Sequence, residues 1–165
     1  MELRKAVHNR RSVRCFRKKK INVRDIKLII KAGIWAPSGL NNQPWKFKVI
    51  QDEKTKRGLA GCTKYASIIT GAEAVICVFL DKKRVYNRDK DIMAIGACVE
   101  NMLLLARSKN IGSCWLGEIL NKKKQAVKIL KVSSSYELMA VLAFGYPKKN
   151  PVKTKRRKFE SFIIG

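Results

Sequence analysis

Histidine is almost absent from this sequence, since His8 is the only one among 165 residues. A Ser-His-Asp or Cys-His nucleophilic site would have to use that single residue, which stands in a basic N-terminal segment. A histidine-rich metal site is excluded by count. If the chain is an enzyme, we therefore expect a bound cofactor to carry the difficult chemistry.

The cysteines form no recognisable pattern. Their number is odd and no two are spaced as C-x-x-C; they are Cys15, Cys62, Cys77, Cys98 and Cys114. Cys77 and Cys98 stand in apolar surroundings, where cysteine behaves as a small hydrophobic residue. These features argue against a disulfide scaffold or a zinc site and predict a reduced, cytoplasmic protein with no bound metal.

Long hydrophobic runs are also lacking. The longest, Ala74 to Leu80, is far too short to cross a bilayer, and the first five residues contain no hydrophobic signal region. We expect a soluble protein with no membrane partner. No repeat or Pro/Gly/Ser-rich linker divides the sequence, so we expect one domain over residues 1–165.

Acidic residues are few, because 12 Asp and Glu stand against 37 Lys and Arg, a formal net charge of +25. This balance favours anionic partners such as nucleic acid, acidic electron carriers or phosphorylated cofactors. A nucleic-acid-binding protein would need a recognition helix, a zinc finger or an aromatic stacking sheet, and none is apparent among 8% aromatic residues. A lysine-rich solvated surface explains the excess equally well, since the basic residues are spread along the chain.

Hydrophobic periodicity predicts helices and strands in mixed order. The expected elements are a helix near Leu3–Val7, a helix from the N-cap Asn22 to Ile34, a half-buried strand Trp45–Val49, a central strand Ala74–Leu80, a helix Asp91–Lys109, a strand Ser113–Leu116, a helix capped by Asn121 and a strand Leu138–Phe144. This order contains no βαβ repeat and therefore predicts an α+β fold.

Two segments look suited to contacts between subunits. The helix over Asp91–Lys109 is apolar most of the way round, and its small residues Ala94 and Ala97 allow another backbone to approach closely, as in the spine of a homodimer interface. The extension over residues 148–165 is basic first and apolar last. Phe159 and Phe162 would be costly to leave in water, so we expect this extension to wrap onto the partner subunit.

Two segments could bind a ligand through polar groups. Arg10-Arg11-Ser12-Val13-Arg14 offers guanidinium forks and a hydroxyl at a helix end, which can grip a phosphate, although such a run also fits a solvated surface. The donors and acceptors of the loop Pro37–Pro44 could recognise a uracil-like heteroaromatic edge, and they belong to Ser38, Asn41, Asn42 and Gln43. Alternatively, those side chains satisfy the backbone of a helix-to-strand connection.

Two further segments complete the set of candidates. In Ile111–Glu118, Gly117 lets a backbone N–H approach a planar ligand, whereas Glu118 is a poor candidate for acid–base catalysis because it has no titrating partner. A second basic cluster precedes the apolar end of the chain and consists of Lys153, Lys155, Arg156, Arg157 and Lys158. The aromatic residues that follow argue against a fully disordered tail.

Together these segments resemble the FMN-dependent nitroreductase family over essentially the whole chain. The shared motifs are R-R-S-V-R (10–14), A-P-S-x-x-N-x-Q-P-W (36–45), A-x-G-A-x-x-E-N-x-L-L-x-A (94–106), G-S-x-W-x-G (112–117) and F-G-Y-P (144–147). The resemblance implies a nitroreductase-like α+β fold with a central mixed, mostly antiparallel sheet flanked by helices. It also implies an intertwined homodimer with two FMN sites at the subunit interface.

The resemblance assigns residues to these sites. Arg10, Arg11 and Ser12, with one or more of Lys155, Arg156 and Arg157, would hold the FMN phosphate, and Arg14 would lie nearer the pyrimidine edge. Pro37, Ser38 and Asn41 would come from the opposite protomer, with Gln43 shaping their loop. Backbone groups of Leu116, Gly117 and Glu118 would face the flavin. The stretch Lys64–Gly71 matches none of the side chains that hold the flavin edge in some relatives.

The chemistry implied is a ping-pong reaction at flavin N5, with NADH or NADPH as electron donor and a nitroaromatic, a quinone or another small organic molecule as acceptor. It needs no catalytic side chain, in agreement with the single histidine. Three alternatives stay open: a basic nucleic-acid-binding protein, a flavin protein with another family chemistry or without turnover, and a flavoprotein reduced by an acidic electron carrier.

Overall fold

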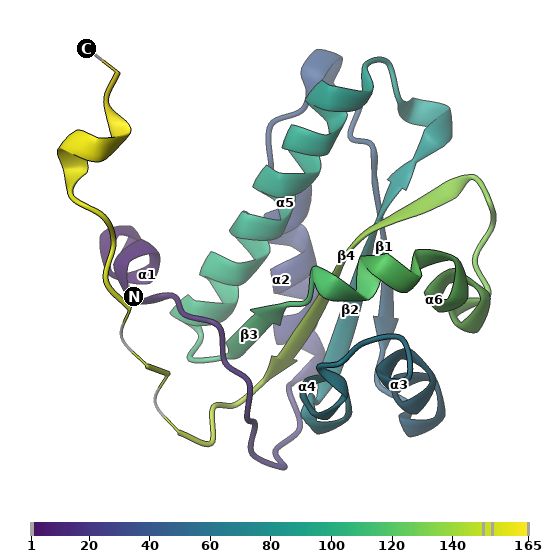
Figure 1. The fold of residues 1–165 in the computed structure, drawn as a ribbon, viewed down its shortest axis with the longest axis horizontal. Coiled ribbons are helices and arrows are strands. Elements are labelled where there is room, and N and C mark those ends of the chain that lie inside the picture. The colour runs from purple at the N-terminus through teal and green to yellow at the C-terminus, as the bar shows by residue number, and fades with distance from the viewer. Residues whose placement is uncertain (1, 150, 153, 165) are drawn as a thin grey trace.

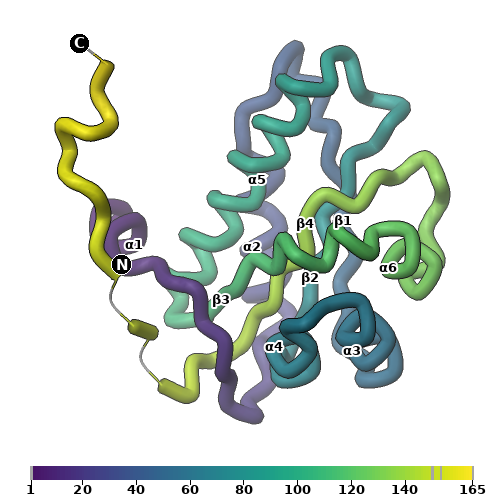
Figure 2. Tube along the Cα trace, in the orientation of Figure 1, coloured from purple at the N-terminus to yellow at the C-terminus, as the bar shows by residue number. Residues whose placement is uncertain are grey.

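The computed structural model describes residues 2–149, 151–152 and 154–164. Its helices and strands are, in chain order, α1 (Leu3–Asn9), α2 (Val23–Ile34), β1 (Trp45–Ile50), α3 (Glu53–Ala60), α4 (Ala66–Gly71), β2 (Ala74–Asp81), α5 (Arg88–Ser108), β3 (Gly112–Trp115), α6 (Lys123–Leu130) and β4 (Tyr136–Gly145). Short 3-10 turns lie at Gly39–Asn41, Lys82–Arg84, Glu118–Lys122 and Phe159–Phe162. Figures 1 and 2 show a long α5 crossing one face of the sheet.

The four strands form one sheet in the order β1-β2-β4-β3, and every neighbouring pair is antiparallel. The parallel component is limited to an isolated bridge between Ser12 and Ser113. All eight residues of β2 are buried, which confirms the predicted central strand. The predicted α+β architecture with a mostly antiparallel sheet is likewise confirmed.

Helices cover both faces of the sheet (Figure 1). Alternate residues of β2 point to opposite sides, as the pleat requires. Val75, Cys77 and Phe79 pack into a core with α3, α4 and α6, whereas Ile76 and Val78 belong to a core with α2 and α5. The two apolar cores make the sheet a rigid support for the loops at its edges.

Of the two predicted helix N-caps, the structure confirms one and contradicts the other. The Asn22 side chain accepts a hydrogen bond from the backbone N–H of Arg24 and caps α2 as expected. The predicted Asn121 cap is wrong, because a 3-10 turn runs through Asn121 and α6 begins only at Lys123, without a side-chain cap. The prediction also missed α3 and α4, whose short apolar faces resemble loop composition.

Parts of the apolar surface stay exposed in the single chain. Ala6 of α1 is buried, but Leu3 and Val7 are 72% and 51% exposed, and Met93 of α5 is 67% exposed. Within β1, Trp45 is buried whereas Val49 is exposed, so the predicted inward alternation fails at its far end. These exposed side chains mark surfaces that this chain alone does not cover.

Residues 154–164 lie apart from the sheet (Figure 1). Phe159, Phe162 and Ile163 are all more than half exposed, and Lys153, part of the predicted basic cluster, lies outside the described residues. In the part of the chain that the structure describes, no helix is long and apolar enough to span a membrane. The described His, Cys, Asp and Glu side chains form no group suited to a metal ion.

Candidate functional site

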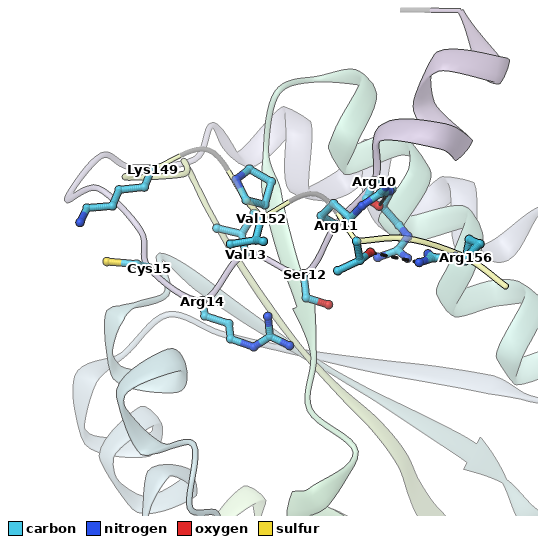
Figure 3. Close-up of a pocket in the computed structure, with 11 residues that line it drawn as sticks. Arg10, Arg11, Ser12, Val13, Arg14, Cys15, Lys149, Val152 and Arg156 are labelled. Atoms are coloured by element: carbon cyan, nitrogen blue, oxygen red, sulfur yellow. Dashed lines mark hydrogen bonds between the residues drawn. The ribbon is translucent and has the colours of Figure 1, made fainter.

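The main cavity lies where the N-terminal and C-terminal segments meet, and its volume is about 440 Å³. Its lining includes the predicted site residues Arg10, Arg11, Ser12, Arg14 and Arg156. Figure 3 shows Arg10, Arg11 and Arg156 at one end, with Arg14 extending from the other side of Ser12. Residues far apart in the sequence thus form one cationic cavity.

Backbone contacts hold the N-terminal segment beside the sheet. The N–H of Val13 donates to the carbonyl of Ser113 on β3 (2.8 Å), and the N–H of Arg17 donates to the carbonyl of Tyr146 after β4 (2.8 Å). A Cβ at Gly112 would lie 2.8 Å from Val13, and one at Gly145 would lie 2.7 Å from Phe16. Both glycines are therefore needed to let this segment approach the sheet.

The cavity is rich in positive charge. Arg10 makes a weak ion pair with Glu100 of α5 (3.5 Å between Nε and Oε1), while none of the described residues that line the cavity is acidic. Arg11 donates to the carbonyls of His8 and Arg10, so part of its guanidinium caps the end of α1. Its Nε is buried without a hydrogen-bond partner. A buried unpaired donor among arginines favours an anionic ligand.

The C-terminal basic cluster contributes unequally. Arg156 lines the cavity and donates to the hydroxyl of Thr154 (3.1 Å). Arg157 instead lies over the ring of Phe162, 4.5 Å from its centroid, and Lys155 is exposed outside the cavity lining. Sequence reasoning missed Lys149 and Cys15 in the lining; the pairing of Phe16 with Pro147, which no local pattern predicts, brings them there.

The loop Pro37–Pro44 lies at a different groove of about 270 Å³, lined by Pro37, Ser38 and α5 residues including Met93 and Ala97. Three of its non-glycine residues have left-handed φ angles, Leu40 (54°), Asn41 (52°) and Gln43 (48°). Such backbone is costly and is often found at functional sites. The Ser38 hydroxyl accepts from the N–H of Gln43 (3.1 Å), and the Gln43 amide donates to Asn41.

A buried carboxylate anchors this loop. Asp91, at the start of α5, is completely buried and accepts hydrogen bonds from Asn42 Nδ2 (2.6 Å) and from the N–H groups of Tyr86 (3.1 Å) and Asn87 (3.3 Å). The same Asn42 amide donates to the carbonyl of Arg84 (2.9 Å). Sequence reasoning missed this pair, since Asn42 stands at an unspecified position of the motif over residues 36–45.

The turn after β3 offers backbone donors. The N–H of Leu116 donates to the carbonyl of Val141 (2.9 Å), so within this turn the donors still available to a ligand are those of the residues that follow. Among the described hydrogen bonds, none is donated by the N–H of Gly117 or of Glu118. A Cβ at Gly117 would meet open space, which leaves room for a ligand or a second chain.

The Glu118 side chain has a local structural partner. Its carboxylate accepts from the Thr63 hydroxyl (2.5 Å) and the Lys64 N–H (3.2 Å), which ties the turn after β3 to the loop after α3. The Thr63 hydrogen bond is the main reason that the pKa of Glu118 lies below its usual value. An ionised carboxylate with two partners is poorly suited to deliver a proton.

Comparison with known proteins agrees with this arrangement. The model of the nitroreductase family matches residues 7–64 and 60–146. A protein of Archaeoglobus fulgidus named "Putative NADH dehydrogenase/NAD(P)H nitroreductase" is 33% identical over 147 residues, which cover 87% of this chain and 84% of that protein.

Two solved structures resemble the whole chain. A Desulfovibrio desulfuricans "putative nitroreductase in complex with fmn" has a TM-score of 0.96 and 38% identity, covering 100% of this chain and 96% of that one. A Clostridium acetobutylicum "Putative NADH Oxidase" has a TM-score of 0.88 and 28% identity, covering 96% and 97%. The likeness extends over at least 96% of each chain in both comparisons.

Proposed function

The chain belongs to the nitroreductase family, and on that premise we propose that it is an FMN-dependent oxidoreductase that carries electrons from NADH or NADPH to a small organic acceptor. The observation that carries this proposal is the cationic cavity, whose lining includes Arg10, Ser12 and Arg156, side chains suited to binding a phosphate. The residues present fit FMN, since Arg11 Nε is buried without a partner and the lining is free of acidic side chains among the described residues.

Different residues of the chain would bind different parts of the cofactor. Arg10, Arg11, Ser12 and Arg156 would hold the phosphate, and Arg14, which lies on the other side of Ser12 in Figure 3, would stabilise negative charge at the pyrimidine edge. When bound, FMN would supply the two-electron chemistry that links a reduced nicotinamide to the acceptor. The N–H groups of Gly117 and Glu118, which donate none of the described hydrogen bonds, would be available to the flavin ring.

A second copy of the chain completes the site. Of the described residues, none lines both the cationic cavity and the groove beside Pro37 and Ser38, so one chain does not bring the two halves together. An apolar groove of about 320 Å³, lined by Leu3 of α1 and Leu104 and Leu105 of α5, stays open. We assign these surfaces to a homodimer in which Pro37, Ser38, Asn41 and Gln43 of each copy approach the cofactor held by the other.

The dimer is tested with Leu3→Asp, because Leu3 is 72% exposed and its replacement leaves the fold of one chain intact. We expect light scattering to show a shift from dimer to monomer, together with weaker FMN retention. A monomeric wild-type protein that retains FMN would contradict the shared site.

The assigned function is tested by turnover of the purified protein with NADH or NADPH and, separately, a quinone and a nitroaromatic acceptor. A ping-pong reaction gives parallel lines in double-reciprocal plots. FMN-loaded protein that oxidises neither nicotinamide would leave a flavin-binding protein without this activity.

A further inference from the structure

Two stretches of the chain contain no acidic residue. Residues 3–24 carry ten Lys and Arg and residues 138–159 carry seven, whereas all 12 Asp and Glu lie elsewhere. Among the described residues of these stretches, the ion pairs are those of Lys5 with Glu2 and of Arg10 with Glu100. The remaining cations have no carboxylate within salt-bridge distance in the described chain.

The fold places the two stretches together. The N–H of Arg17 donates to the carbonyl of Tyr146 (2.8 Å), and the N–H of Lys148 donates to the carbonyl of Cys15 (3.0 Å). The exposed cations of this region form what we name the basic terminal surface: Arg14, Arg17, Lys18, Lys19, Lys20, Lys148, Lys149, Lys155, Arg156, Arg157 and Lys158.

The basic terminal surface continues from the cofactor cavity. Arg14 and Lys149 line that cavity, whereas Arg17 and Lys19 line an adjoining groove of about 280 Å³ that also contains Arg107. The Nε of Arg107 is buried without a partner, like that of Arg11. The arginines at one end of the cavity are enough to neutralise the single phosphate of FMN. Most cations of the basic terminal surface are therefore not needed to bind FMN.

We propose that the basic terminal surface docks an acidic one-electron carrier protein, which reduces the bound FMN as an alternative to NAD(P)H. This inference rests on the proposed function. Two reduced carriers, each giving one electron in succession, are oxidised for each FMN reduced, and the accompanying protons come from solvent. A surface of one charge sign attracts such a partner over several ångströms and raises its association rate.

A protein partner fits this surface better than nucleic acid does. Single-stranded nucleic acid binds by stacking bases on aromatic rings beside cations. Here the Lys19 ammonium lies 4.6 Å from the centroid of the Tyr146 ring, and Arg157 lies over Phe162, so one face of each ring is already occupied by a cation of the chain. Arg14, Lys149 and Arg156 belong both to this surface and to the lining of the cofactor cavity, so a protein docked on the surface would lie beside the cofactor.

The test uses the FMN-loaded protein and a reduced plant-type [2Fe–2S] ferredoxin as the acidic carrier. The variant K18E/K19E/K20E reverses three exposed charges that do not line the cofactor cavity. The matched control K54E/K124E/K128E makes the same change in net charge on α3 and α6, at the other side of Figure 1 from the chain termini. Stopped-flow absorbance gives the rate of flavin reduction, and calorimetry gives binding of oxidised ferredoxin.

We expect the second-order rate with ferredoxin to fall roughly tenfold or more in K18E/K19E/K20E, and by less than about threefold in the control. The wild-type rate should fall steeply as salt is raised from about 0.05 to 0.5 M, while reduction by NAD(P)H stays unchanged in all three proteins.

The other outcomes separate the two proposals. A ferredoxin rate that ignores both salt and charge reversal, in protein that NAD(P)H reduces, overturns the docking surface alone. Duplex DNA bound more tightly than ferredoxin, with the same dependence on Lys18–Lys20, overturns it in favour of nucleic acid. If the protein binds ferredoxin but takes up no FMN, the proposed function is overturned, and delivery of electrons to FMN is overturned with it.

Discussion

Replacing Asn42 with Ala should destabilise the protein through a single buried contact. The amide of Asn42 is the donor to Asp91 Oδ1, whereas the N–H groups of Tyr86 and Asn87 both donate to Oδ2. Asp91 is completely buried, so the substitution leaves a carboxylate oxygen without a partner away from water. We estimate a loss of about 2–3 kcal/mol in the free energy of unfolding from an unpaired buried group of this kind.

For a chain of this size, such a loss lowers Tm by roughly 5–10 °C. Urea unfolding and calorimetry of the cofactor-free protein measure it directly. Asn121→Ala is the control, because Asn121 is exposed in the turn before α6 and should change Tm little. The contact also holds the loop in which Leu40, Asn41 and Gln43 have left-handed backbone, so FMN affinity of the dimer should fall as well. A Tm within about 1 °C of the wild type would refute the assignment of Asn42 as the anchor of this loop.

Three further results are expected. Glu118→Gln should have a small effect on turnover in a steady-state assay, whereas Arg10→Ala and Arg14→Ala should have a large effect on FMN retention. Comparable losses in all three variants would contradict the assigned roles. The paired guanidinium of Arg88 and the ammonium of Lys123 lower the pKa of Glu137 from 4.5 to about 2. A carboxyl group whose pKa is lowered on folding stabilises the protein above pH 4.5, and this stabilisation is lost as the pH falls toward 2. Glu137→Gln should therefore lower the free energy of unfolding by about 1 kcal/mol at pH 7, a modest value because Arg88 is half exposed, and by little at pH 2. Urea titrations at the two pH values measure the difference. Under native conditions a thiol reagent should modify the exposed Cys15 quickly and the other four cysteines, which are buried, slowly. Burial also raises the pKa of Cys77 and Cys98 to about 12. FMN should protect Cys15, which lines the cavity, and equal reactivity of all five cysteines would contradict the described burial.

The long elements could be predicted because their patterns are local. The uninterrupted apolar run of β2 and the long apolar helix α5 need no knowledge of the rest of the fold. The helices α3 and α4 could not be predicted in the same way, because they are six to eight residues long and depend on packing against the sheet. The Asn121 cap failed because a 3-10 turn leads directly into α6, which leaves no separate cap position.

The site was predictable as a set of motifs but not as a geometry. The cationic residues at 10–14 and Arg156 meet in one cavity, as the family resemblance implied. Local sequence does not reveal that Lys149 joins them, that Arg157 turns to Phe162, or that Asp91 anchors the loop at Asn42. Each of these depends on which segments the sheet brings side by side.

Binding of the FMN phosphate in the cationic cavity is tested by the dissociation constant of FMN, measured by flavin fluorescence. The wild-type protein should bind one FMN per chain, and Arg156→Ala should raise the dissociation constant roughly tenfold or more through loss of a charge-assisted hydrogen bond. Arg157→Ala, the neighbouring arginine that lies over Phe162 outside the cavity lining, should bind FMN as the wild type does. Equal weakening by both substitutions, or a wild-type protein that takes up no FMN, would contradict the account.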